Sequence, residues 1–217
     1  MTLPALSWCR RAILLALVGL VSACTTIQLE PLPEGMTDQP PAGWKATRQQ
    51  LAAFDRWDLS GKLAVRQPSD SGTALINHWR QDGSRYELAL SSAFLGMGST
   101  RLQGSPGSLE LTLANGDQYR STNPEQLVAD ATGWQLPLES LSWWIRGLPA
   151  PGGGARLLFD QSGQLAMIQQ AGWDIRYDRW QRFMDRLPAL PQRITAVSGD
   201  RRVRLAISQW QPLGPAE

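Results

Sequence analysis

WDLSGKLAVR, residues 57–66, is the stretch that decides the fold of this chain. Apolar residues or glycine occupy every second position, and polar, charged or small residues lie between them. Side chains along a β-strand alternate between two faces, so this period predicts a strand with one buried and one hydrated face.

The same alternation returns along the rest of the chain, and turn dipeptides such as Asp82-Gly83 and Asn115-Gly116 separate the segments. About ten such segments predict a large antiparallel sheet, which must curl, split or close to protect its edges. The clearest repeats are Tyr86-Leu88-Leu90, Leu109-Leu111-Leu113, Trp173-Ile175-Tyr177 and Val203-Leu205-Ile207.

Three stretches have helical instead of strand-like spacing: residues 44–54, 123–132 and 138–146. Asn123 followed by Pro124 is typical of a helix start, and Gly147 ends the last stretch. The second and third interrupt the strand series, so we expect them to cover the mouth or the concave face of a curved sheet. A lid over a cavity and a cover on a solid core both fit this pattern.

The N-terminus has the three parts of a secretory signal in residues 1–23: Arg10 and Arg11, an apolar run too short to span a bilayer, and small residues before Cys24. Cys9, the other cysteine, would be removed with the signal, so a disulfide is excluded. We therefore expect Cys24 to be acylated, residues 24–43 to form a Pro-rich tether, and residues 44–217 to form the folded domain.

Charge argues against a nucleic-acid partner. Loss of Arg10 and Arg11 leaves 19 basic residues, which balance the 19 acidic ones. A neutral mature chain supplies no stripe of cations for phosphates. Nine of the ten tryptophans remain after Trp8 is removed, so much weakly polar area must be buried or must meet an apolar ligand.

Residues for metal or covalent chemistry are scarce. His78 is the only histidine, so no multi-histidine metal site can form, and we expect no metal and no cofactor. A lipid-acting hydrolase would depend on His78, yet no Gly-x-Ser-x-Gly motif accompanies it. The run Gly152–Gly154 lacks the lysine of a phosphate-binding loop and reads as a turn.

One turn is unusually apolar. Phe94, Leu95 and Met97 lie among glycines and serines in the segment 91–99, between two predicted strands. Such a tip either folds back against a helix or projects as a wedge into an acyl layer. Full burial of Phe or Leu releases up to about 1.5–3 kcal/mol each, which is enough for transient membrane contact.

Taken together, Cys24 and four motifs resemble the LolB family of outer-membrane lipoprotein receptors. The motifs are GKLAV at 61–65, FLG at 94–96, TGWQLPL at 132–138 and WWIRGLP at 143–149. The likeness spans nearly the whole mature chain.

The resemblance implies a mainly β fold with inserted helices: a half-open antiparallel β-barrel of about eleven strands around an apolar cavity. It also implies transfer without bond chemistry, in which acylated lipoproteins arrive from a LolA-type periplasmic carrier and enter the inner leaflet of the outer membrane. Leu95 best matches the family's membrane-inserting leucine, within a loop that comprises Phe94, Leu95, Gly96 and Met97. Thr25 and Thr26 after the cysteine agree with residence at the periplasmic face of the outer membrane, and we expect a monomer that contacts phospholipid.

Two alternatives to this transfer function stay open: a structural scaffold lipoprotein with a solid core, and a hydrolase that uses His78.

The strand pattern also predicts which side chains face the acyl cavity. The expected lining comprises Leu63, Val65, Leu88, Leu90, Leu109, Leu111, Leu113, Ile175 and Leu205, with Trp143 and Trp144 on a covering helix.

Overall fold

A computed structural model describes residues 34–92 and 98–214 of the chain. Within them, eleven strands form one antiparallel sheet in the order β6-β5-β4-β3-β2-β1-β11-β10-β9-β8-β7, so the two edges, β6 and β7, do not pair with each other. The predicted large antiparallel sheet is confirmed. The strands are β1 (Arg56–Arg66), β2 (Ser71–Asp82), β3 (Arg85–Ser92), β4 (Gly98–Ser105), β5 (Ser108–Thr112), β6 (Gln118–Ser121), β7 (Arg156–Phe159), β8 (Leu165–Gln170), β9 (Trp173–Gln181), β10 (Leu190–Ser198) and β11 (Arg201–Pro212).

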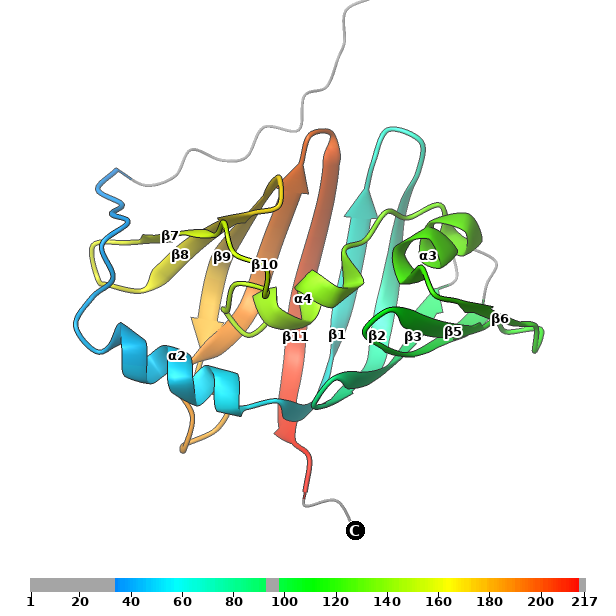
Figure 1. Cartoon of the computed structure of the whole chain (residues 1–217), viewed down its shortest axis with the longest axis horizontal. Helices are drawn as coiled ribbons and strands as arrows, with labels where there is room; N and C mark the ends of the chain where they lie inside the picture. Colours follow the sequence, from blue (N-terminus) through cyan, green and yellow to red (C-terminus); the bar gives the residue numbers. More distant parts are fainter. Residues whose placement is uncertain (1–33, 93–97, 215–217) are drawn as a thin grey trace, which may run out of the picture.

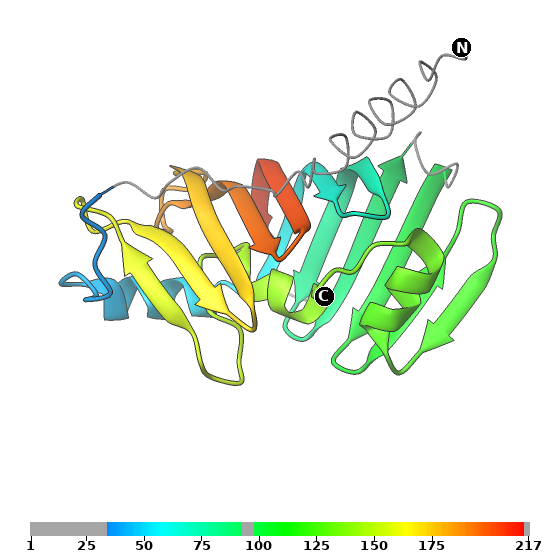
Figure 2. The ribbon, with the colours of Figure 1, turned by 90° about the horizontal axis from the view of Figure 1, so that it is seen from above.

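In the described part of the chain, three helices accompany the sheet: α2 (Trp44–Ala53), α3 (Pro124–Thr132) and α4 (Leu138–Trp144). The sheet curves around α3 and α4, which lie on its concave side (Figures 1 and 2). Asn123 caps α3 as predicted, since its side chain accepts a hydrogen bond from the Gln126 amide at 3.2 Å.

β1 lies at the centre of the sheet, between β2 and β11. Trp57, Leu59, Leu63 and Val65 are buried on its concave face, as the alternation predicts. Gly61 allows the closest approach of β11, because a Cβ there would collide with the Ala206 carbonyl oxygen. The pairing of β1 is irregular on both sides near Gly61.

Aromatic packing closes the lower part of the core. The Trp57 ring lies edge-on to Trp79 and Trp210, with centroids 5.7 and 5.1 Å apart. Phe54, just after α2, reaches Trp210 at 5.9 Å and so joins the helix to this cluster. These contacts account for part of the predicted tryptophan burial.

The chain before α2 packs against the sheet edge from Glu34 onward. Thr37 and Phe159 of β7 exchange two backbone hydrogen bonds of 3.0 and 2.8 Å, and the Arg156 guanidinium lies 3.3 Å from the Asp38 carboxylate. The second half of the predicted 24–43 tether is thus docked on β7, where it satisfies groups that an open edge strand would expose. Within residues 34–92 and 98–214, no helix is long and apolar enough to cross a membrane.

Candidate functional site

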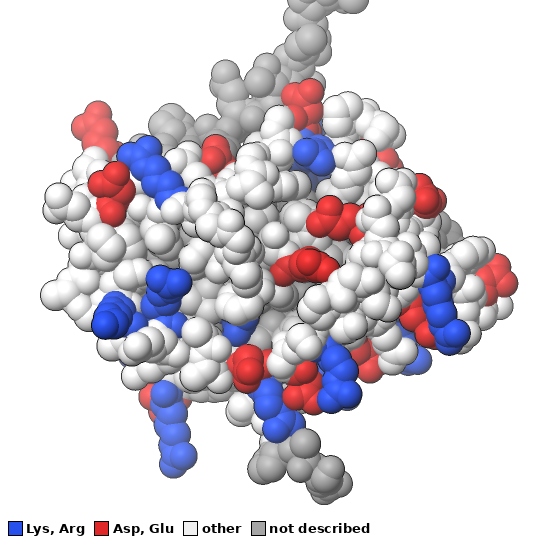
Figure 3. Space-filling model, viewed as in Figure 1, with Lys and Arg blue, Asp and Glu red and all other residues white. Residues whose placement is uncertain are grey.

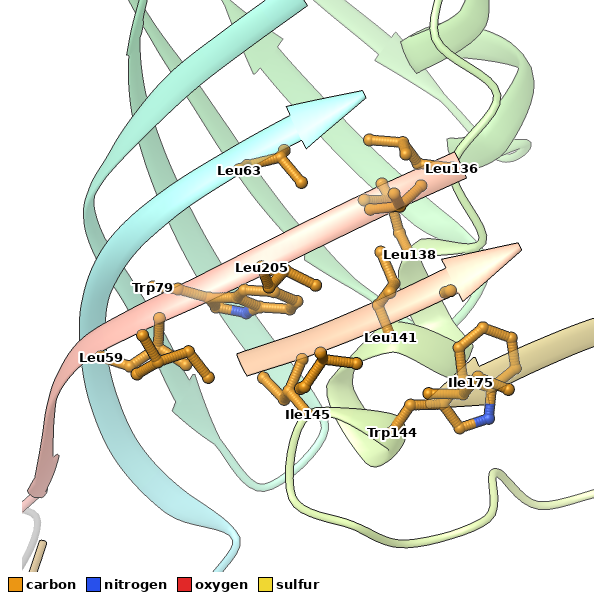
Figure 4. Close-up of a cluster of buried hydrophobic side chains, with 14 of the residues drawn as sticks. Leu59, Leu63, Trp79, Leu136, Leu138, Leu141, Trp144, Ile145, Ile175 and Leu205 are labelled. Carbon is orange, nitrogen blue, oxygen red and sulfur yellow. The ribbon is translucent and has the colours of Figure 1, made fainter. Parts of the chain in front are cut away.

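An apolar cavity lies between the sheet and the covering segment α3–linker–α4, which we call the lid (residues 124–144). Five strands, β1 to β4 and β11, form its floor. The side chains of Leu136, Leu138 and Leu141 approach it from the lid, opposite Leu63 and Leu205 of the sheet (Figure 4). Its full lining comprises Leu63, Ala74, Ile76, Trp79, Leu88, Leu90, Thr100, Leu102, Val128, Thr132, Trp134, Leu136, Leu138, Leu141 and Leu205.

The cavity is small and almost entirely apolar. Its volume is about 30 Å³. Among its lining residues, Thr100 and Thr132 are the only ones with a side-chain oxygen. A space of this size holds a water molecule or two but not an acyl chain. The described structure is therefore a closed state, in which side chains of the lid fill the space above the sheet.

Three polar atoms of cavity-lining residues lack a hydrogen-bond partner among the described residues: Thr100 Oγ1, Trp79 Nε1 and Trp134 Nε1. All three side chains are buried. Buried polar groups are normally hydrogen-bonded, so each of these atoms could still form a hydrogen bond with a ligand in the cavity.

The predicted lining residues fall into three groups. Leu63, Leu88, Leu90 and Leu205 line the cavity. The other inward-facing residues belong to the surrounding core: Val65, Leu109, Leu111, Trp144 and Ile175 are buried, and Leu113 and Trp143 are partly buried against them.

Sequence reasoning missed several lining residues. In β2 a register shift between Ile76 and His78 moves the buried face from even to odd positions, so Trp79 faces inward together with Ala74 and Ile76. Trp134 and Leu136 lie in the linker between α3 and α4, where no period marks them. The TGWQLPL motif at 132–138 was the signal in the sequence that could have identified these two residues.

Polar contacts hold the linker between α3 and α4 at the edge of the sheet where β1 ends and β11 begins. The buried Gln67 side chain, just after β1, donates to the Gly133 carbonyl oxygen and accepts from the Gln135 amide at 3.4 Å. Arg201, at the start of β11, donates to the Gln135 side-chain oxygen at 2.9 Å. We call these contacts the latch.

Buried contacts hold the other end of the lid. Trp144 Nε1 donates to Gln170 at 2.9 Å, and the buried Tyr177 hydroxyl donates to the Trp144 carbonyl oxygen at 2.8 Å. Arg146 donates to the Phe54 carbonyl oxygen at 2.9 Å. Gly147 has φ +77°, and a Cβ there would lie 2.5 Å from the Trp180 ring, so the chain leaves α4 through a tightly packed turn.

Burial at this end is deep enough to shift ionisation. Burial lowers the pKa of Arg146 to about 10, although the Asp55 carboxylate opposes the shift. Burial also raises the pKa of Tyr177 well above its usual value. The C-terminal end of α4 is thus anchored in a dry environment.

A wider groove of about 560 Å³ lies outside the cavity, between α2, α4 and the lower ends of β2 and β3. It shares Trp79 and Leu138 with the cavity lining, so these two side chains separate the inner space from the groove. On this face most charged side chains lie toward the rim (Figure 3).

His78 lies outside this region, on the opposite face of the sheet. Its Nε2 is 3.2 Å from the Glu87 carboxylate, which also pairs with Arg101. In the part of the chain that the structure describes, no three His, Cys, Asp or Glu residues are grouped as a metal site would require.

Comparison with known proteins supplies the family. A family model described as outer membrane lipoprotein LolB matches residues 55–210. The chain belongs to the LolB family. A relative from Marinobacter nauticus, named outer-membrane lipoprotein LolB, is 67% identical over 195 residues, which cover 90% of this chain and 94% of the relative. A LolB of Pseudomonas syringae is 36% identical over 210 residues, covering 94% and 96% of the two chains.

A solved structure supports the same architecture. A LolA-superfamily protein from Nitrosomonas europaea superimposes with a TM-score of 0.50 at 9% identity, covering 78% of this chain and 95% of that one. At this identity the likeness concerns the fold alone. The superposition thus relates the curved sheet and helices of this chain to the fold of that neighbour.

Two predicted functional elements lie outside the described residues. These are Cys24, the expected acylation site, and the apolar loop residues Phe94, Leu95, Gly96 and Met97. The strand ends that flank the loop, Ser92 and Gly98, are paired with each other at the end of the β3–β4 hairpin.

Proposed function

We propose that this LolB-family protein accepts acylated lipoproteins from a LolA-type carrier and passes them to the inner leaflet of the outer membrane. The acyl chains would enter the space between the sheet and the lid. No bond is made or broken in the cargo, so neither a catalytic group nor a cofactor takes part.

The observation that carries this proposal is the lining of the cavity. Apolar side chains from five strands and both lid helices converge on one space, and their only oxygen-bearing members are two threonines. The unpartnered atoms of Thr100, Trp79 and Trp134 suit the carbonyl oxygens near the head of an acylated cysteine, which accept hydrogen bonds.

Opening is part of the proposal, because a cavity of about 30 Å³ must enlarge before it takes a chain. Release of the latch at Gln67 would let the linker and α3 move while the C-terminal end of α4 stays fixed by Trp144 and Arg146. Each buried CH₂ of the cargo contributes about 0.8 kcal/mol, which offsets the cost of exposing the lining.

Direction comes from graded affinity. The cavity should bind the acyl chains more tightly than the carrier does and less tightly than the bilayer, with about 1.4 kcal/mol for each tenfold step. Cys24 would hold the protein at the periplasmic face of the membrane as a monomer. The loop 94–97, with Leu95 as the principal wedge, would enter phospholipid during delivery.

Crosslinking from two neighbouring residues of β2 tests the proposal. Ile76 faces the cavity, and Leu75 is 53% exposed on the opposite face. A small diazirine-bearing amino acid at position 76 should crosslink to acylated lipoprotein delivered by the carrier, while the same group at position 75 should not. Equal crosslinking from both positions, or crosslinking from 75 alone, would remove the cavity as the binding site.

A further inference from the structure

The convex face of the sheet carries a concentrated group of cations, although the mature chain is neutral. They lie on β1, β9, β10 and β11, all turned away from the core. We call this group the basic face; it comprises Lys62, Arg66, Arg176, Arg179, Arg193, Arg202 and Arg204.

The strand register places these cations beside one another. Arg66 is paired directly with Arg202 across β1 and β11, and Arg193 with Arg179 across β10 and β9. Arg204 is paired with Thr195 of β10, and its position along the strands lies between those of the two arginine pairs. The Cα atoms of directly opposite residues in an antiparallel sheet are only about 4.5–5.5 Å apart, so each pair places two like charges at neighbouring positions of one face.

Carboxylates offset this charge only in part. Two aspartates of β9 share this face with the seven cations: Asp174 accepts a hydrogen bond from Gln169 at 3.0 Å and Asp178 from Thr195 at 2.7 Å. Among the described residues, none of the ion pairs involves Lys62, Arg66, Arg179, Arg193, Arg202 or Arg204.

The other half of the convex face is arranged differently. There Arg80 lies 3.5 Å from Asp58, Arg101 3.2 Å from Glu87 and Arg120 2.8 Å from Glu110. Among the described residues, the sheet thus pairs these cations of β2 to β6 with carboxylates, and leaves six cations of the basic face, all except Arg176, outside the ion pairs. Like charges opposite one another in a sheet destabilise it, so folding alone does not account for the arrangement.

Burial and the neighbouring cations Arg204 and Arg66 lower the pKa of Arg202, which agrees with mutual repulsion at the centre of the face. An external anion would relieve it. Arginine is well suited to phosphate, because its planar group donates paired hydrogen bonds.

We propose that the basic face binds the anionic phosphate headgroups of the membrane surface. Among residues 34–92 and 98–214, the basic face has no exposed aromatic side chain beside its cations, and Leu75 is its one exposed large apolar neighbour. A protein partner would require an apolar centre, whereas a layer of phosphates requires only charge and donors.

The position of the anchor agrees with this occupant, a point that rests on the proposed function. Glu34, whose carbonyl oxygen accepts from Gln161 after β7, lies in the β7–β11 half of the sheet, which carries most of the basic face. Glu34 lies ten positions after Cys24, so the acylated cysteine lies at most about 33–36 Å away. Docking through the convex face leaves the lid on the opposite face accessible to the carrier.

Vesicle co-sedimentation of the mature chain, residues 24–217 with Cys24→Ala, tests the proposal, because the signal and the acyl anchor are then both absent. We expect binding to vesicles of phosphatidylcholine mixed with phosphatidylglycerol, weakening with added salt, and little binding to phosphatidylcholine alone. The combined K62Q, R66Q, R202Q and R204Q variant should lose about fivefold in affinity for each cation removed.

The matched control removes the same charge from the neutralised half of the sheet, through R80Q, R85Q, R101Q and R120Q. It should lose far less affinity, and R66K, R202K and R204K together should retain binding. Unchanged binding by the basic-face variant, or an equal loss in the control, would overturn the proposal.

Cargo uptake without vesicles separates this inference from the proposed function. A basic-face variant that binds vesicles normally but fails to take cargo from the carrier would reassign the face to carrier docking. Normal vesicle binding by a protein whose Ile76 position never crosslinks to cargo would strike the proposed function and leave the basic face standing.

Discussion

At the scale of single residues, Gly61 sets how closely the two central strands approach. A Cβ at this position would collide with backbone atoms of Ala206 and Ile207, which cannot rotate away as a side chain could. We expect Gly61→Ala to lower the free energy of unfolding by about 1–3 kcal/mol, measured by urea denaturation. Ser60→Ala, one residue earlier, is the control and should change stability little; equal losses would show that crowding at Gly61 is not the cause.

Tyr86 gives a prediction for alkaline pH. Burial, followed by the negative charge of Glu139, raises its pKa to about 12, and its hydroxyl lacks a hydrogen-bond partner among the described residues. The folded protein therefore holds this proton at pH values where the unfolded chain has lost it. Its contribution to stability is complete below about pH 10 and disappears as the pH rises through 12.

The measurement is the phenolate absorbance during an alkaline titration, compared between the native protein and Tyr86→Phe. The difference between them should show a group that ionises near pH 12. A difference signal that develops fully near pH 10 would contradict the described burial.

Residue by residue, sequence could predict which face a side chain occupies but not its distance from a small cavity. Leu63 and Leu205 line the space, while Ile175 faces the same side and belongs to the solid core several strands away. The inward position of Trp79 was not predicted, because one extra residue in β2 reverses the alternation. Thr100 escaped because a polar side chain gives no sign of facing inward.

At the scale of elements, the lid is attached at two places, by the latch at its linker and by the buried contacts of Trp144 and Arg146. Gln67→Ala removes both of its hydrogen bonds to the linker. We expect faster hydrogen exchange in residues 133–141 and increased binding of an apolar dye, because open forms of the lid become more populated.

Gln169→Ala is the matched control, since Gln169 bonds Asp174 on the convex face and contacts no part of the lid. It should leave both signals unchanged. A Gln67→Ala protein whose lid exchanges as slowly as before would show that apolar packing alone keeps the lid closed.

The loop between β3 and β4 carries the next prediction, which concerns residues outside the described structure. Leu95→Glu should leave cargo acceptance intact and block delivery to liposomes, because a charged tip opposes entry into acyl chains. Leu95→Ile keeps the apolar surface and should deliver normally. Equal loss of acceptance and delivery in the glutamate variant would remove the wedge mechanism.

The elements themselves could largely be predicted from the sequence. All three helices have residues whose spacing or caps predict them, and the alternating segments became strands. The docking of residues 34–43 could not be predicted, because Thr37 pairs with Phe159 through backbone groups that leave no mark in the side-chain pattern.

For the whole molecule, the proposed division is between an anchor that fixes location and a domain that handles cargo. A Cys24→Ala protein, exported without its lipid, should still take acylated lipoprotein from the carrier, because the lid and the cavity lie wholly within residues 63–205. Crosslinking through position 76 measures this directly. Loss of uptake in a folded protein would make the anchor part of the transfer machinery.

The small volume of the empty cavity bears on the fidelity of transfer. A permanently open apolar hollow beside a membrane would fill with stray phospholipid, and cargo would then have to compete for an occupied place. Here the lining side chains fill most of the cavity themselves and leave a volume of only about 30 Å³. Under the proposed function, access would depend on a donor that arrives already holding acyl chains. The chains would then pass directly from one protein to the other, and an empty, water-exposed cavity would rarely form.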